Sequence, residues 1–101
     1  MEYRDLYSGL IKLHILHHAV EEPVYGQGMI EELARHGYKI SPGTLYPILH
    51  AFEKKGYVKS KNKLFEGRIR RFYEGTKLGK LALNAAKIKV QELFGELFES
   101  E

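Results

Sequence analysis

The stretch that decides the fold is Ser41-Pro42-Gly43-Thr44-Leu45-Tyr46-Pro47-Ile48-Leu49, which occupies residues 41–49 of the chain. A serine followed by a proline is typical of a helix start, because the hydroxyl accepts from free N–H groups and proline suits the first helical position. Apolar residues then repeat with helical spacing as far as Phe52, and Gly56 ends the helix. Pro47 leaves two alternatives open: an irregular first turn after Ser41, or a regular helix that begins nearer Thr44.

Two further helices are predicted before this stretch. Residues 3–21 place Leu6, Leu10 and Leu13 at spacings of four and three, which is the helical period, and Pro23 ends that helix. Additional apolar residues widen its surface beyond one stripe, so we expect the helix to pack on two sides. A second helix is predicted from about residue 26 to residue 36, with Gly37 in the position of a left-handed C-cap.

A β-hairpin and a final helix are predicted after Gly56. Residues 57–62 and 69–73 are rich in strand formers and flank a turn at Glu66-Gly67. Thr76 then caps a long helix that runs to about Glu99. The order α-α-α-β-β-α gives a mainly α fold with a small β-hairpin, which is the winged helix-turn-helix architecture. In that architecture the third helix enters the major groove of DNA, and the hairpin, or wing, lies along the backbone or the minor groove.

The composition limits the class of protein. A chain of 101 residues with 44% hydrophobic residues has the length and the apolar content of one domain with a core. Within it we expect residues 1–75 to form the DNA-binding part and residues 76–101 the dimerisation helix. The absence of cysteine excludes zinc ribbons, disulfide frameworks and thiol catalysis. No run approaches the roughly 18 consecutive apolar residues of a spanning helix, so we expect a soluble, cytoplasmic protein with no membrane partner.

Positive charge is concentrated in one part of the chain. Residues 54–80 contain ten basic and two acidic residues, a net charge of +8, whereas the remainder contains six basic and eleven acidic residues. A basic tract on an otherwise acidic body is typical of a surface that binds a polyanion. Charge alone fits a solvated hairpin equally well, so the interpretation depends on the elements that carry the tract.

Candidate DNA-binding residues fall on the predicted third helix and on the hairpin. Short hydroxyls near a helix N-terminus suit phosphate or base-edge contacts, because the helix dipole and free N–H groups favour an anion there. The alternative is that Ser41 and Thr44 only cap the helix and that Tyr46 packs. Side chains alternate between the two faces of a strand, so only some of the basic residues of the hairpin can touch one duplex. Lys63 and Arg68, which flank the tip, are the best placed. The predicted contacts are Ser41, Gly43, Thr44, Tyr46 and Lys54 on the helix and Lys63, Arg68 and Arg70 on the hairpin.

The last predicted helix carries apolar residues in two directions. One seam follows alternating spacings of three and four residues, whereas Phe94 and Phe98 lie off it. Such a helix contacts its own domain and a second surface, most simply that of a second copy of the chain. The alternative is a single broad stripe that faces the core of its own chain. The seam contains Leu83, Val90, Leu93 and Leu97.

Few residues point to catalysis or to metal binding. His14 and His18 are four apart on the first predicted helix and are spaced to share a metal ion, but the sequence identifies no third ligand, so a packed or surface pair is favoured. No nucleophile motif surrounds any of the four serines, and Gly26-Gln27-Gly28 lacks the rest of a dinucleotide fingerprint. We therefore predict a protein that is not an enzyme and uses no metal or cofactor.

Together the motifs resemble the PadR-type transcriptional regulators, specifically the short subgroup with a single C-terminal helix. The resemblance covers about residues 8–83. Its most specific block is residues 41–49, which match the family pattern S-x-G-T-L-Y-P-x-L. Further blocks lie in order and at the right spacing at residues 23–26, 53–60, 70–73 and 76–79.

The resemblance implies repression of an adjacent gene by a homodimer formed through the first and last helices. It also implies a DNA contact at Tyr25, and release of DNA when a flat aromatic or cationic compound binds near the dimer interface, for which a small hydrophobic effector is predicted here. A winged-helix module used only for protein–protein contact or dimerisation is the alternative. Gly75 replaces an apolar residue usual in the family, which predicts a looser joint between hairpin and last helix. The dimer contacts are then Leu6, Leu10 and Leu13 with the seam residues Leu83, Val90, Leu93 and Leu97, and the aromatic residues left for a ligand pocket are Tyr3, Tyr7, Phe94 and Phe98.

Overall fold

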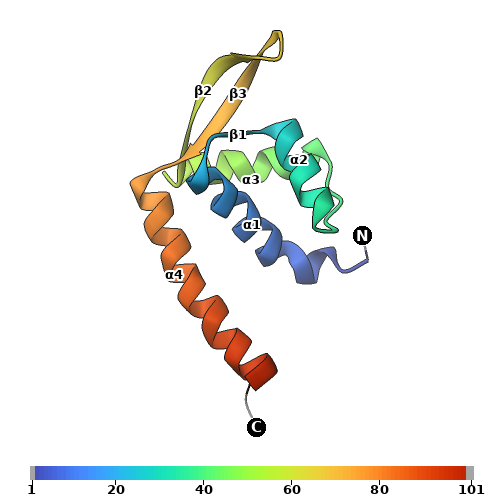
Figure 1. Ribbon diagram of the computed structural model, residues 1–101, viewed down its shortest axis with the longest axis vertical. Coiled ribbons are helices and arrows are strands. Elements are labelled where there is room, and N and C mark those ends of the chain that lie inside the picture. Colours follow the sequence, from blue (N-terminus) through green and yellow to red (C-terminus); the bar gives the residue numbers. More distant parts are fainter. Residues whose placement is uncertain (1, 100–101) are drawn as a thin grey trace.

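The computed structural model describes residues 2–99 of the chain. Three helices pack together, the hairpin projects from one end of this unit, and the last helix projects from the other (Figure 1). This arrangement confirms the predicted winged helix-turn-helix architecture. The elements are α1 Arg4–Glu21, β1 Val24–Tyr25, α2 Gly26–Arg35, α3 Pro42–Lys54, β2 Val58–Phe65, β3 Arg68–Gly75 and α4 Lys77–Phe94, followed by a π-helical turn Gly95–Glu99.

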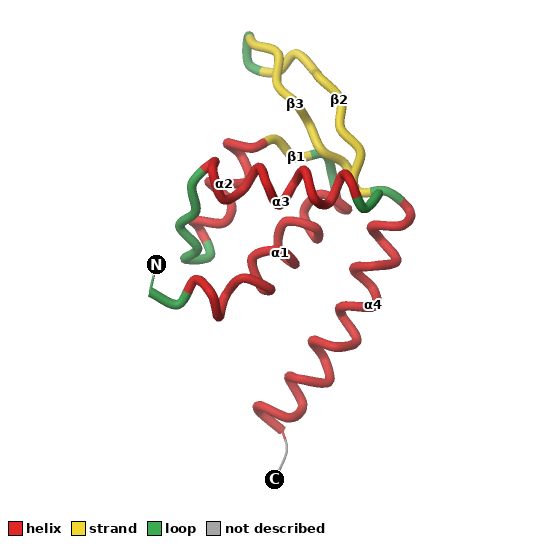
Figure 2. The backbone as a smooth tube through the Cα atoms, turned by 180° about the vertical axis from the view of Figure 1, so that it is seen from behind, coloured by secondary structure: helices red, strands yellow, loops and turns green. Residues whose placement is uncertain are grey.

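The core lies where α1, α2 and α3 meet the base of the hairpin, and α3 runs between the hairpin and α1 (Figure 2). α1 faces this core with a different set of residues from the predicted stripe at positions 6, 10 and 13. Leu6 is 76% exposed and Leu10 is 47% exposed, so these two are left on the outside, whereas Leu13 is partly buried and packs against the core. The buried core residues are Ile11, Ile15, Leu16 and Ala19 of α1, Met29 and Leu33 of α2, Leu45, Leu49 and Phe52 of α3, and Ile40, Val58, Tyr73 and Leu83.

α3 begins at Pro42 and contains Pro47, which resolves the alternatives left open by the sequence. Ser41 is the N-cap residue with an extended backbone, and its carbonyl accepts hydrogen bonds from the N–H groups of Thr44 and Leu45 at 3.0 Å each. Pro47 lies on the exposed side, where its ring meets solvent instead of the core. The helix is therefore regular enough to bury Leu45 and Leu49 while its other side faces outward.

The sheet has three antiparallel strands in the order β1-β3-β2, one more than predicted. The hairpin turns at Glu66 and Gly67, which both have positive φ (51° and 79°), as a two-residue turn of this kind requires. β1 contributes two residues, with Tyr25 opposite Phe72 on β3. This short pairing fixes the entry of α2 to the base of the hairpin.

The joint between the hairpin and α4 is close, which corrects the prediction of a looser joint at Gly75. A Cβ atom on Gly75 would lie 2.7 Å from the Cα atom of Val20 on α1, so the missing side chain lets β3 approach α1. Thr76 caps α4 as predicted, because its hydroxyl accepts from the N–H of Gly79 at 3.0 Å and donates to the carbonyl of Gly56 at 2.5 Å. Within residues 2–99, no helix has the length and apolar character needed to span a membrane.

Candidate nucleic-acid interface

The hydroxyls at the start of α3 are exposed and do not cap it. No side-chain hydrogen bond from Ser41 reaches the backbone of the first turn, and its Oγ atom lies 3.5 Å from the Oγ1 atom of Thr44. The prediction that the Ser41 hydroxyl caps the helix is therefore wrong, although the residue occupies the capping position. Both hydroxyls stand beside the N-terminal, positive end of the helix, where an anion is favoured.

Two glycines of α2 let two tyrosines lie against its first turn. A Cβ atom on Gly26 would overlap the hydroxyl of Tyr46, and a Cβ atom on Gly28 would lie 2.9 Å from the ring of Tyr25. Tyr46 therefore reaches from α3 across to the start of α2, and it remains 36% exposed. Glycine at these two positions has a spatial explanation that the sequence alone did not offer.

The register of the hairpin separates its side chains onto two faces. Lys63 is opposite Arg70, and Phe65 is opposite Arg68, so these side chains share one face. The other face carries Val58 and Tyr73 into the core at its base. By the same register, Arg71 lies on the core-side face, and the basic residues that share the first face are Lys59, Lys61, Lys63, Arg68 and Arg70.

Two of the predicted hairpin contacts are held by aromatic rings. The guanidinium of Arg70 lies 4.8 Å from the ring centre of Tyr25 and donates from Nε to the carbonyl of Phe65 at 3.4 Å. Its side chain is only 19% exposed. The ammonium of Lys63 lies 4.7 Å from the ring centre of Phe72. Arg68, by contrast, is exposed next to the tip of the hairpin.

A concave surface joins α3 to the hairpin, and we refer to it as the α3–hairpin groove. It has a volume of about 300 Å³. Because the start of α3 and strand β3 border the same hollow, Tyr46, Arg68 and Arg70 meet at one surface, whereas Lys63 lines a separate hollow beside Glu21 and Glu22. The lining residues of the α3–hairpin groove are Tyr25, Gly26, Gln27, Ile30, Pro42, Tyr46, Arg68, Ile69, Arg70 and Arg71.

Other predicted contacts lie around this groove or away from it. Ser41, Gly43 and Thr44 belong to the same N-terminal turn as Pro42 and Tyr46. Lys54 is exposed in the last turn of α3, about 15 Å along the helix axis from Thr44 at 1.5 Å per residue, so the structure does not bring it to the groove.

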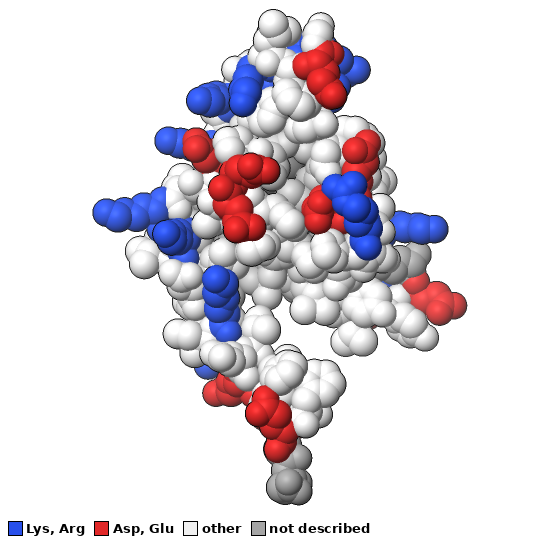
Figure 3. Space-filling view, viewed as in Figure 1, with Lys and Arg blue, Asp and Glu red and all other residues white. Residues whose placement is uncertain are grey.

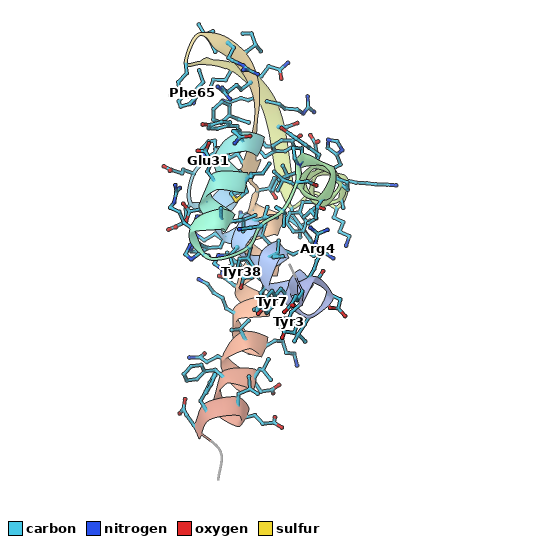
Figure 4. All side chains as sticks on the ribbon, turned by 90° about the vertical axis from the view of Figure 1, so that its right-hand side faces the viewer. Tyr3, Arg4, Tyr7, Glu31, Tyr38 and Phe65 are labelled. Atoms are coloured by element: carbon cyan, nitrogen blue, oxygen red, sulfur yellow. The ribbon has the colours of Figure 1, made fainter. Side chains whose placement is uncertain are left out.

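Arg4 is a neighbour of this surface that sequence reasoning missed. Its Nη1 atom donates to the Oγ1 atom of Thr44 at 3.4 Å, although the two residues are 40 apart in the chain. Figure 4 shows Arg4 reaching from the start of α1 toward α3, away from Tyr3 and Tyr7. No local pattern marks this residue, because only the packing of α1 against α3 brings it there.

Charge is unevenly distributed over the surface. On the face drawn in Figure 3, lysine and arginine gather on the hairpin at the top of the view, and carboxylates gather over the middle of the molecule.

An ion pair and a hydrogen bond connect the base of the hairpin to α3. Glu53 on α3 accepts a hydrogen bond from Ser60 and lies 3.6 Å from Arg71 Nη2. The basic hairpin is thus fixed in orientation relative to α3.

The predicted dimer contacts are mostly exposed apolar side chains. Leu93 is 55% exposed and Leu97 is 63% exposed, and α4 buries only Gly79 and Leu83 among its described residues. Leu83 belongs to the core of its own chain. An open groove of about 620 Å³ runs between α1 and α4, with Leu10, Leu13, His14, His17, Leu83, Lys87, Val90, Gln91 and Phe94 as its lining.

The four aromatic residues predicted for a ligand pocket form two separate pairs. The rings of Tyr3 and Tyr7 lie 6.0 Å apart, and Tyr7 packs on Tyr38 (Figure 4). Phe94 and Phe98 lie 5.0 Å apart at the end of α4. Among the described residues, only Phe94 of these four lines the groove between α1 and α4.

Histidines from two helices meet on the α1–α2 side of the molecule. His36, at the end of α2, lies with its ring centre 4.7 Å from that of His14, which supplies the third imidazole that the sequence did not identify. Burial, and then the neighbouring imidazoles of His36 and His18, lower the pKa of His14 below its ordinary value. A hydrogen bond from Arg35 lowers the pKa of Glu32, which accepts from this cluster.

The exposed third helix beside a basic two-stranded wing defines the winged helix-turn-helix class of proteins. Residues 15–85 match the Transcriptional regulator PadR-like family, so the chain belongs to that family, which consists of regulators and not of enzymes. This finding confirms the resemblance read from residues 41–49.

The chain is similar to other regulators, in sequence and in structure, along nearly its whole length. The chain is 43% identical over 94 residues to the transcriptional regulator Rv3488 of Mycobacterium tuberculosis, covering 93% of this chain and 88% of that protein. It superposes on a PadR family transcriptional regulator from Eggerthella lenta with a TM-score of 0.81 and 28% identity, covering 96% of this chain and 88% of that one. A PadR-like regulator from Bacillus cereus gives a TM-score of 0.82 at 26% identity, with 96% and 99% covered.

Proposed function

We propose that the chain binds specific double-stranded DNA as a homodimer and represses transcription from the promoter that it occupies. The observation that carries this proposal is the α3–hairpin groove, because the start of α3 and the basic strand of the wing border one hollow. In this arrangement α3 enters the major groove while the hairpin follows the adjacent backbone.

The two halves of the surface have different roles. Arg68, at the groove, and Lys63, farther round the hairpin, neutralise phosphates, which gives affinity that depends steeply on salt and little on sequence. Thr44 and Tyr46, on the exposed side of α3, supply the base-edge or water-mediated contacts that discriminate sequences. Arg70 is stacked on Tyr25 and positions that ring at the edge of the groove.

The homodimer forms through the exposed apolar stripes of α1 and α4. Leu6, Leu93 and Leu97 are each more than half exposed, and together they give a face that a second copy covers. A two-fold axis between such copies sets two α3 helices about 34 Å apart in successive major grooves, so the operator is a near palindrome.

A small hydrophobic effector releases the DNA by binding between α1 and α4. The groove there is lined mainly by leucine, valine and phenylalanine side chains, which suit an apolar ligand. An effector in this position changes the angle between α4 and the winged-helix unit, and thereby the spacing of the two α3 helices.

The DNA test is fluorescence anisotropy of the labelled upstream region of the chain's own gene, compared with unrelated DNA of equal length. Arg68→Glu should weaken binding to both DNAs, and Arg68→Ala should reduce the salt slope by about 0.9 if one phosphate contact is lost. Thr44→Ala should weaken binding to the upstream region more than to unrelated DNA. Lys89→Glu on α4 is the matched charge reversal away from the groove and should leave both affinities unchanged.

The alternative, a winged-helix module for protein contact alone, gives a different result. It predicts equal, weak binding to both DNAs at low salt and no effect of Thr44→Ala. That outcome would refute the DNA-binding proposal.

The dimer has its own test. Light scattering after gel filtration should give twice the chain mass for the wild type and the chain mass for Leu93→Glu. Lys89→Glu should remain a dimer, because it makes α4 more negative by an even larger amount without placing a charge on the apolar seam.

A further inference from the structure

Three imidazoles from two helices converge on the side of the molecule formed by α1 and α2. His14 and His18 lie one turn apart on α1, and their ring planes are nearly parallel, 14° apart. His36 completes the group from the end of α2. One ring nitrogen of each residue lies within 4.8 Å of the others.

The turn after α2 holds His36 in place. Its backbone N–H bonds to the carbonyl of Leu33, and Gly37 follows with a φ of +87°, which ends the helix in a left-handed cap. Tyr38 then returns to α1, where its ring lies 5.3 Å from that of His14. His36 therefore meets α1 because of a defined backbone turn that also directs Tyr38 back onto α1.

A carboxylate lies beside these three rings. The Oε2 atom of Glu32 lies 3.1 Å from Nε2 of His36 and 3.6 Å from Nε2 of His18. Its Oε1 atom accepts from Arg35 at 2.6 Å, which leaves Oε2 toward the imidazoles. Side chains from both α1 and α2 thus place possible metal-ligand atoms around one small volume.

We propose that His14, His18 and His36 bind a divalent first-row transition metal ion of the class of Zn²⁺, with Glu32 as the fourth ligand or as the carboxylate that orients a ligating imidazole. Neutral imidazole is the preferred nitrogen ligand for such ions, and three histidines with a carboxylate form a set that suits tetrahedral Zn²⁺. At Zn–N distances of about 2.0–2.1 Å, tetrahedral ligand atoms are about 3.3 Å apart. The nitrogens close from within 4.8 Å to that spacing by small side-chain rotations, because the rings are only partly buried.

A second histidine group shares His18 but is less suited. It consists of His17, His18 and Glu21, all on α1. His17 is already paired with Glu21 at 3.3 Å, and these two side chains are 45% and 64% exposed. Ligands from a single exposed helix surface are less constrained than ligands that two packed helices hold together, so the three-histidine group is the proposed site.

The site ties α1 to the end of α2. Because the unfolded chain does not hold these donors together, binding adds to stability by mass action. At a free Zn²⁺ concentration about 100 times Kd, the melting temperature of a domain of this size should rise by on the order of 10 °C.

The test is isothermal titration of the full, tag-free chain with Zn²⁺ in the absence of DNA, with melting curves on the same samples. The wild type should bind one ion per chain. His14→Ala and His36→Ala should each weaken that binding at least tenfold and remove the thermal shift. His17→Ala, and His50→Ala on α3, remove one imidazole elsewhere and should bind as the wild type does.

Two outcomes would overturn the proposal. One is a wild-type chain that takes up no Zn²⁺, and the other is tight binding that survives His36→Ala but is lost in His17→Ala. Metal-free melting curves and circular dichroism show whether each variant folds, and Glu32→Gln gives a further reading if an alanine variant does not. Since no DNA is present, failure here is distinguishable from failure of the proposed regulator function.

Discussion

Gly79, in the first turn of α4, is the position where one added methyl group should do most harm. A Cβ atom there would overlap the carbonyl oxygen of Tyr57 and would lie 2.9 Å from its carbonyl carbon. That carbonyl also accepts the hydrogen bond from the N–H of Thr76 at 3.0 Å. The methyl group of Gly79→Ala therefore meets backbone, which cannot rotate away as a flexible side chain can.

The size of the effect follows from three contributions. Overpacking costs about 1–3 kcal/mol, and weakening the bond between Thr76 and Tyr57 costs about 0.5–1.5 kcal/mol. Alanine in place of glycine stabilises a helix by about 1 kcal/mol, which offsets part of this cost. Gly79→Ala should therefore lower the free energy of unfolding by about 2 kcal/mol, which corresponds to a melting temperature lower by roughly 8–16 °C.

Gly9 provides the matched control, because it lies within α1 and a Cβ atom there meets nothing within 4 Å. Gly9→Ala should raise the free energy of unfolding by about 0.5–1 kcal/mol, so the same substitution changes stability in opposite directions at the two sites. Urea denaturation followed by circular dichroism, at one fixed protein concentration, measures both. A Gly79→Ala chain as stable as the wild type would refute the reasoning.

Three further expectations concern the joint and the groove. Thr76→Ala should lower the free energy of unfolding by about 1–2 kcal/mol in urea, since it removes the cap of α4, and Thr76→Ser should restore most of it. Gly26→Ala should displace the Tyr46 hydroxyl and reduce affinity for the upstream DNA as much as Tyr46→Phe does, with an unchanged salt slope. Arg4→Ala should weaken binding to all DNA alike in anisotropy titrations and flatten the salt dependence, because it removes a cation beside Thr44; an unchanged slope would mean that Arg4 contacts no phosphate.

The sequence predicted those parts of the fold that short-range patterns determine. Pro42 at a helix start, the Glu66-Gly67 turn and the Thr76 cap each depend on a few neighbouring residues, and all three are present. β1 was missed because two residues are too few to show alternation, and only pairing with β3 makes them a strand.

The two regions of the site were predicted, but not the contacts between distant segments that surround them. The pattern placed hydroxyls on α3 and basic residues on the hairpin, whereas the closeness of Arg4 to Thr44 and of His36 to His14 depends on packing between distant segments. For the first helix, periodicity showed that apolar residues cover two faces but not which face is inside, and the structure buries the face of Ile11 and Ile15 and leaves Leu6 and Leu10 outside. That ambiguity is itself informative, since the stripe left outside is the one expected to meet a second copy.

The close joint at the base of α4 gives the proposed dimer a geometric requirement. α4 has 18 residues and is about 27 Å long, so a tilt of about 10° at its first turn displaces its far end by about 5 Å. Two α3 helices must keep a spacing of about 34 Å to enter successive major grooves, and a displacement of that size on each chain removes the match. Two close backbone approaches limit this tilt, that of Gly75 to Val20 and that of Gly79 to Tyr57. Both lie at the start of α4, where a small rotation displaces the far end of the helix most. The same contacts define what the proposed effector between α1 and α4 has to overcome, because in that proposal it releases DNA by changing the angle that these two glycines fix.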